Sequence, residues 1–215
     1  MLRSMFVQQL EESVTHIQEL GERTLVQLDR AIACFETGDT SKVDEIIAND
    51  KKINKRELEL NEQVFDIIAR QQPVASDLRK LIVVMKISGD LERVADLAVD
   101  MAKVSRRISA VDDDTISELS SLAKDARAMV AKALVAYKEK DVFAAQQLAK
   151  EDDVIDERFG KFIKRLFRQD VNEQNIEETT QLAFIARYVE RIADYATNLS
   201  EWIIYEANGH HFDLN

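Results

Sequence analysis

The sequence predicts an all-α protein built as two pseudo-symmetric antiparallel three-helix bundles, with six long helices. Glycine and proline are scarce, with five and one in 215 residues, so few turns interrupt the chain. Apolar residues recur at helical spacing, and no segment alternates with the period of a strand. The segment 90–101 returns in similar form at 188–199, and 38–54 returns at 140–156, which indicates an internal duplication.

The first repeat, residues 1–109, is expected to hold three helices. The first helix spans about 4–36 and ends at Gly38, because glycine readily adopts the left-handed conformation of a helix C-terminus. The second runs from about residue 40 to Pro73, the single proline, which forces a break. The third spans about 75–108.

The second repeat, residues 114–209, is expected to repeat this pattern. Thr115 and Glu118 have the spacing of a capping box, which predicts the start of the fourth helix, and this helix reaches about Lys140. The remaining helices are expected at about 141–168 and 176–208, followed by Gly209 and a tail at 210–215.

Composition limits the classes of function. The chain carries 40 acidic and 29 basic residues, a net charge of −11, which disfavours nucleic acid and anionic lipid as direct partners. No apolar run approaches the ~20 residues that cross a bilayer, and the N-terminus lacks a secretory signal, so we expect a cytoplasmic protein without direct membrane insertion. The single cysteine, Cys34, lies on an apolar stretch and is interpreted as a buried, inert thiol.

Acidic pairs at helical spacing are the chemical feature that both repeats share. Glu92 and Asp96 lie one helical turn apart, as do Glu190 and Asp194. Relative to the apolar stripe of their helices, both pairs are predicted to point outward, away from the main core. In a chain that is 32% charged, such pairs also arise on ordinary solvated faces, neutralised by neighbours such as Arg93.

The hairpin geometry predicts a partner for each pair. Asp50 and Asn54 precede Pro73 by about as many residues as Glu92 and Asp96 follow it, and antiparallel neighbours equidistant from a turn lie at one height. This count fixes only the height and leaves the direction of the side chains open. The second repeat offers the corresponding set Asp152, Asp156, Glu190 and Asp194. Oxygen ligands of this kind suit Mg, Mn, Fe or Ca, and four carboxylates are expected to bind more tightly than three.

The sequence gives little support to an enzyme. None of the three histidines, His16, His210 and His211, follows a glutamate by three residues, so the Glu-x-x-His motif of di-iron bundles is absent. No phosphate-binding glycine loop and no nucleophile triad are present. We interpret the pair at 210–211 as part of a mobile tail. A metal-binding bundle with a storage or catalytic role remains an alternative, as does a structural adaptor without metal.

Four motifs together resemble the PhoU family of phosphate-signalling regulators. They are ARQQPVASDLRKL (69–81), SGDLERVADLA (88–98), ARYVERIADYATNL (186–199) and IIYEANG (203–209). The resemblance implies a cytoplasmic negative regulator, not an enzyme, that links the ATPase of a phosphate ABC transporter to a sensor histidine kinase. We also expect a homodimer.

The resemblance further implies metal sites built from acid-x-x-x-acid motifs, with Fe, Zn, Mn or Mg as the expected ions. Asn54 departs from the carboxylate pattern, which makes the first site the weaker one. The candidate metal ligands are Asp50, Asn54, Glu92, Asp96, Asp100, Asp152, Asp156, Glu190 and Asp194.

Overall fold

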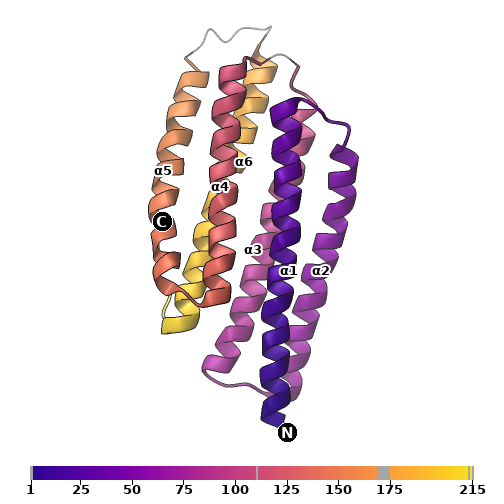
Figure 1. Ribbon diagram of the computed structural model, residues 1–215, viewed down its shortest axis with the longest axis vertical. Helices are drawn as coiled ribbons and strands as arrows, with labels where there is room; N and C mark the ends of the chain where they lie inside the picture. The colour runs from indigo at the N-terminus through magenta and orange to yellow at the C-terminus, as the bar shows by residue number, and fades with distance from the viewer. Residues whose placement is uncertain (1, 110, 169–174, 213, 215) are drawn as a thin grey trace.

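The protein is an antiparallel array of six long helices (Figure 1), which confirms the all-α prediction. The structure is a computed structural model that describes residues 2–109, 111–168, 175–212 and 214, with side chains from residue 5 onward. The helices are α1 (Leu2–Thr37), α2 (Val43–Gln71), α3 (Ser76–Ser105), α4 (Asp113–Glu139), α5 (Val142–Leu166) and α6 (Ile176–Asn208).

The helices group into two bundles that meet through equivalent helices. In the first bundle α1, α2 and α3 contact one another pairwise, and α4, α5 and α6 do the same in the second. The bundles join where α1 contacts α4 and where α3 contacts α6. Each joining helix therefore meets its own counterpart, which is the pattern of a two-fold axis. The third member of each bundle, α2 or α5, lies on the outer side (Figure 1).

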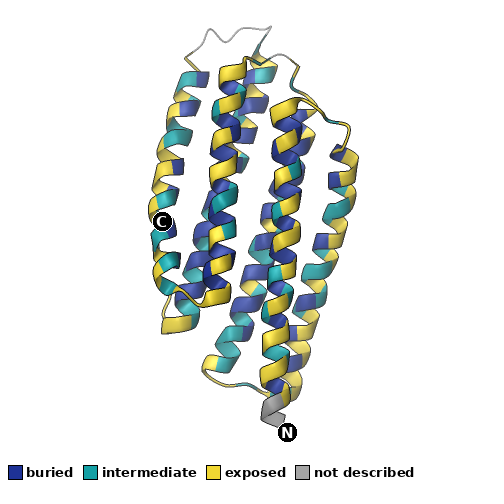
Figure 2. Cartoon of the chain, viewed as in Figure 1, coloured by how far each residue is buried: buried dark blue, intermediate teal, exposed yellow. Residues whose placement is uncertain are grey.

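The duplication extends to the first helix of each repeat. Seven of the buried apolar positions of α1 recur as buried apolar positions of α4 after 102 residues. The matched pairs are Ile17 with Leu119, Leu20 with Leu122, Leu28 with Val130, Ala31 with Ala133, Ile32 with Leu134, Cys34 with Ala136, and Phe35 with Tyr137. Figure 2 shows the result, with buried residues on the sides of the helices that face each other.

The helix ends differ from the predicted bounds by a few residues, and one cap differs in identity. α4 begins two residues before Thr115, so Asp112 and not Thr115 is its N-cap, and the Asp112 carboxylate accepts a hydrogen bond from the backbone N–H of Thr115 at 2.8 Å. Glu118 forms an ion pair with Arg165 instead of closing a capping box. Gly209 ends α6 with φ 77°, as predicted. Most of the break expected between the helices at about 141–168 and 176–208, residues 169–174, lies outside the described residues.

Gly21 of α1 lies directly against Leu134 of α4. A Cβ atom at this buried position would lie 2.5 Å from the side chain of Leu134 in α4. A Cβ atom on Gly160, inside α5, would have no neighbouring atom within 4 Å. Both glycines are helical, but only Gly160 has room for a methyl group.

We therefore expect Gly21→Ala and Gly160→Ala to change the free energy of unfolding in opposite directions. Gly160→Ala should raise it by ~0.5–1 kcal/mol through helix propensity alone. Gly21→Ala gains the same propensity but should lose ~1–3 kcal/mol through overpacking against Leu134. Urea denaturation of both variants measures the difference. Equal stabilisation by the two changes would contradict the overpacking, because it would show that the Leu134 side chain moves aside at little cost.

Candidate metal centre

The acidic residues predicted for the second repeat converge between α5 and α6. Asp156, Glu190 and Asp194 each offer one carboxylate oxygen, and these three oxygens lie within 4.8 Å of one another. Asp152 lies one turn before Asp156 on α5, and the charges of Asp156 and Asp194 raise its pKa. We call these four residues the second-repeat cluster.

The prediction that Glu190 points outward is wrong. Glu190 is only 9% exposed and Asp152 only 6% exposed. The side of α6 opposite its main apolar stripe is covered by α5, so a carboxylate there is removed from solvent without entering the central core. Asp156 remains exposed and Asp194 is half-buried, which leaves an open side to the cluster.

Several polar atoms of this site have no hydrogen-bond partner within the described part of the chain. They include Asp152 Oδ1 and Glu190 Oε2. The hydroxyl of Thr197 on α6 makes no geometrically good hydrogen bond, but it lies near enough to Asp152 to lower the pKa of that carboxyl. The other oxygen of Glu190 accepts from the Arg187 guanidinium. A buried polar atom without a hydrogen-bond partner costs ~1–3 kcal/mol of stability. The cluster therefore contains carboxylate oxygens that are free to bind a ligand such as a metal ion.

Burial and mutual repulsion act together on the carboxyl groups of the cluster. Burial, followed by the charges of Asp156 and Asp194, raises the pKa of Asp152 to about 6. Burial and Asp194 raise the pKa of Glu190, and burial and Asp156 raise the pKa of Asp194. Arg187 lowers the pKa of both residues in part, and Arg191 lowers that of Asp194. The arginines do not remove the excess negative charge.

The donor set fits a hard cation. Oxygens bound to one ion at ~2.0–2.6 Å lie at most ~4–5 Å apart, which matches the 4.8 Å spread of the three carboxylates. All donors are oxygen, and no histidine or thiol contributes, which favours Mg, Mn, Ca or Fe over softer metals. A bound cation would occupy the unsatisfied oxygens and relieve the repulsion between the acids.

The first repeat brings its predicted residues together in a weaker form. Asp96 lies near enough to both Asp50 and Glu92 to raise their pKa, although burial is the larger cause for each. Both carboxylate oxygens of Asp50, however, already accept hydrogen bonds from amides. Gln27 donates at 2.9 Å and Asn54 at 3.4 Å. These neutral donors occupy the oxygens that a cation would use.

Sequence reasoning missed Gln27, which distinguishes the two repeats. Gln27 is fully buried on α1 and also donates to the backbone carbonyl of Ala95 at 3.2 Å. Its counterpart 102 residues later is Met129, which is buried and offers no N–H. Met129 therefore cannot give Asp152 the amide hydrogen bond that Gln27 gives Asp50. A glutamine in the apolar stripe of the first helix was the available signal.

An arginine pairs with acids at both sites, with Glu190 alone through Arg187 in the second repeat and with two acids through Arg93 in the first. Arg93 forms ion pairs with Asp96 at 3.3 Å and with Glu92 at 3.6 Å, as the solvated-acid interpretation expects. Asp100, also a candidate ligand, pairs with Lys103 at 3.2 Å, and its charge helps to raise the pKa of Tyr188 on α6. Asp100 is not among the carboxylates that raise the pKa of Asp50 or Glu92.

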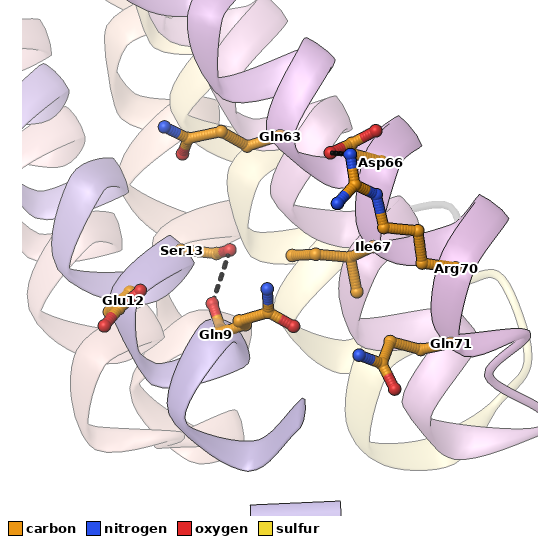
Figure 3. Close-up of a pocket in the computed structure, with 8 residues that line it drawn as sticks. All are labelled: Gln9, Glu12, Ser13, Gln63, Asp66, Ile67, Arg70 and Gln71. Carbon is orange, nitrogen blue, oxygen red and sulfur yellow. Dashed lines mark hydrogen bonds and ion pairs between the residues drawn. The ribbon is translucent and has the colours of Figure 1, made fainter. Parts of the chain in front are cut away.

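Outside the clusters, the described residues include no further group of three acids, histidines or thiols close enough to share one metal ion. Cys34 is buried, as predicted, and burial raises the pKa of its thiol. His16 is hydrogen-bonded to Gln63 at 3.1 Å. A cavity of about 240 Å³ opens between the first turns of α1 and the last turns of α2 (Figure 3), where Arg70 is already paired with Asp66 at 2.8 Å. The cavity is lined by Gln9, Glu12, Ser13, Gln63, Asp66, Ile67, Arg70 and Gln71.

The raised pKa of Asp152 gives a pH-dependent effect on stability. Because this pKa is higher in the folded protein than its ordinary value of 3.8, ionisation of Asp152 destabilises the fold as pH rises from about 4 to about 6. In metal-free protein, Asp152→Asn should therefore add ~1–2 kcal/mol of stability at pH 7, after allowance for solvent screening, and nothing below pH 4. Chemical denaturation across this pH range measures the effect.

The exposed neighbour Asp153 serves as the control, and Asp153→Asn should change stability by less than ~0.5 kcal/mol at every pH. A pH-independent effect of Asp152→Asn would show that Asp152 ionises freely in the folded protein.

The comparisons with known proteins agree with this architecture. The model of the PhoU domain family matches residues 17–105 and 119–203, and each matched segment falls inside one repeat. Over 222 aligned residues the chain is 32% identical to the phosphate-specific transport system accessory protein PhoU homolog of Clostridium acetobutylicum, with all of both chains covered.

Two solved structures share the fold. The phosphate transport system regulatory protein PhoU of Streptococcus pneumoniae superposes with a TM-score of 0.90 at 26% identity, covering 97% of this chain and 99% of that one. PhoU of Pseudomonas aeruginosa gives 0.87 at 27% identity, covering 95% of this chain and 100% of that one. Matches in both repeats and over the whole fold show that the chain belongs to the PhoU family.

Proposed function

We propose that this protein is a regulatory accessory component of a phosphate-specific transport system. The observation that carries the proposal is the full-length match to a relative of that name, with a PhoU domain in each repeat. The described helices include none that is both long and apolar enough to cross a membrane. A membrane-bound transporter would therefore be reached through protein contacts.

The finer form of the proposal is a cytoplasmic negative regulator, acting as a homodimer. It would connect the ATPase of a phosphate ABC transporter to a sensor histidine kinase. Two features support an adaptor rather than an enzyme. The long bundle surface offers extended helix faces for partners, and no histidine joins the clustered carboxylates of the described chain.

We also propose that the second-repeat cluster holds a divalent or trivalent cation. The chemistry such an ion supplies is neutralisation of four acids at one height of the α5–α6 pair. Asp156, Glu190 and Asp194 would hold the ion, with Asp152 as the buried fourth acid. Relief of this repulsion would tighten the packing of α5 on α6. Ion binding would thereby change the outer surface that α5 forms on the second bundle.

The metal proposal predicts that isosteric removal of charge abolishes binding. Calorimetric titration of EDTA-treated protein with Mn²⁺ should show one stronger site in the parent chain. The double variant Glu190→Gln plus Asp194→Asn should weaken it at least ~10-fold, since two of the three converging oxygens lose their charge.

Two controls accompany this titration. Asp153→Asn plus Glu157→Gln removes the same charge from exposed positions of α5 and should leave binding almost unchanged. Glu92→Gln plus Asp96→Asn alters the first repeat, where amides already occupy Asp50, and should also have little effect on the stronger site. Unaltered Mn²⁺ binding in the Glu190 and Asp194 variant would identify the cluster as ordinary solvated acids.

The regulatory proposal is tested in cells. Deletion of the gene should derepress a phosphate-starvation reporter in phosphate-replete medium, and the parent chain should restore repression. Pull-down of the parent chain with the transporter ATPase and the sensor kinase then identifies the partners. A reporter that stays silent in the deletion strain would contradict negative regulation, whatever the metal titration shows.

A further inference from the structure

The described residues of the C-terminal tail, 210–212 and 214, include two that contact α6, His211 and Leu214, where the sequence suggested a mobile tail. The imidazole of His211 stacks on the ring of Tyr205, with 4.1 Å between centroids and 9° between planes. The same imidazole lies edge-on to Trp202 at 5.4 Å. Beyond it, the backbone N–H of Leu214 donates to the Glu201 carboxylate at 2.8 Å.

The surface beneath the tail is built from both repeats. Trp202 of α6 donates its indole N–H to Asp90 of α3 at 3.0 Å, which fixes the ring across the boundary between the bundles. Trp202 and Tyr205 are themselves in edge-to-face contact, at 6.1 Å and 84°. Lys86 lies over Trp202 at 5.4 Å and Arg79 over Tyr205 at 5.6 Å. These contacts hold the aromatic pair in place independently of the tail.

The tail itself is held lightly. Residues 210–212 are exposed, and Phe212 is 47% exposed. Three ring and backbone contacts, from His211 and Leu214, attach the segment to α6, and the partly buried side chain of Leu214 also packs against the hydrophobic core. Only two residues separate Asn208, the last residue of α6, from His211, so the short tether keeps the imidazole at high effective concentration near its site. An external ligand must therefore bind more tightly than the few contacts of His211 and Leu214 in order to displace the tail.

We propose that Glu201, Trp202 and Tyr205 form a docking site for an extended segment of a partner protein that carries an arginine or histidine side chain, and that the tail occupies this site in its absence. The tail indicates which groups the site binds: a planar ring that stacks on Tyr205 and a backbone N–H that donates to the Glu201 carboxylate. Arg79 shows that Tyr205 accepts a guanidinium group, and a planar cation would also meet the Glu201 carboxylate. The inference rests neither on phosphate regulation nor on the metal cluster.

Trp202 is the single tryptophan of the chain, so its emission reports on this site alone. His211→Ala in the full-length protein should change the emission maximum and the near-ultraviolet circular dichroism of Trp202. His210→Ala is the matched control, because His210 is exposed and makes no ring contact in the described chain, and it should leave both signals unchanged. Identical spectra for the parent and His211→Ala would overturn the docked tail.

A second measurement tests the docking site directly. The probe is a fluorescein-labelled peptide with the sequence of residues 208–215, used as such and with its own His211→Arg change. Its affinity for full-length His211→Ala should exceed its affinity for the parent chain and for His210→Ala by ~3- to 10-fold, since the internal competitor has been weakened. Tyr205→Leu, added to His211→Ala, should abolish this gain.

The remaining outcomes also decide the proposal. Equal binding of the peptide to the parent and His211→Ala chains, or no binding to either, would overturn it. If His211→Ala instead shifts the sedimentation coefficient of the protein, the tail docks between copies of the chain, and the intramolecular arrangement is refuted.

Discussion

The structure depends on the burial of α3 and α6 on more than one side. Each of these helices packs within its own bundle and also against its counterpart in the other. Small residues allow this close packing, and Ala95, Ala98, Ala193 and Ala196 are all fully buried. Only a narrow strip of each helix then remains for polar side chains, and α2 or α5 partly covers it. The acids on this strip are desolvated because the fold leaves them no fully exposed position.

The sequence was sufficient to predict the arrangement of the helices and the level of the acidic residues along the bundle axis. Scarce turn residues, the apolar periodicity and the two repeated segments predicted six helices in two bundles, and counting from Pro73 placed Asp50 at the level of Glu92. The direction of the side chains was not predictable in this way, because it depends on how far α5 is rotated toward α6. An outward position on an isolated α6 becomes a covered one when α5 packs against it, so Glu190 was misplaced. The Asp112 cap and the contacts of His211 likewise depend on a few local bonds without periodicity.

The two repeats show how one duplicated frame supports unlike chemistry. Asp50 and Asp152 occupy equivalent positions, yet Asp50 accepts from Gln27 and Asn54 while Asp152 has an unsatisfied oxygen. The difference follows from two substitutions between the repeats, Gln27 against Met129 and Asn54 against Asp156. An amide donor stabilises a buried carboxylate without an ion, whereas an apolar neighbour leaves its desolvation uncompensated. A bound cation is therefore expected to stabilise the second repeat more than the first, although both repeats retain the same acids on α3 and α6.

The cluster and the tail share one strip of α6, which raises the question of whether they influence each other. Asp194 and Glu201 are seven residues apart, so they lie on the same helix face about 10 Å along the axis. A unit charge at ~10 Å in water changes the energy of another by only ~0.4 kcal/mol, and physiological salt screens over about 8 Å. A cation bound at Asp194 would therefore barely alter the attraction of Glu201 for a planar cation. Coupling through packing is a separate route, because α5 contacts α6 directly whereas Trp202 is fixed by Asp90 of α3. The two features therefore act on different boundaries: the cluster on the contact of α5 with α6, and the tail on the junction between the two bundles.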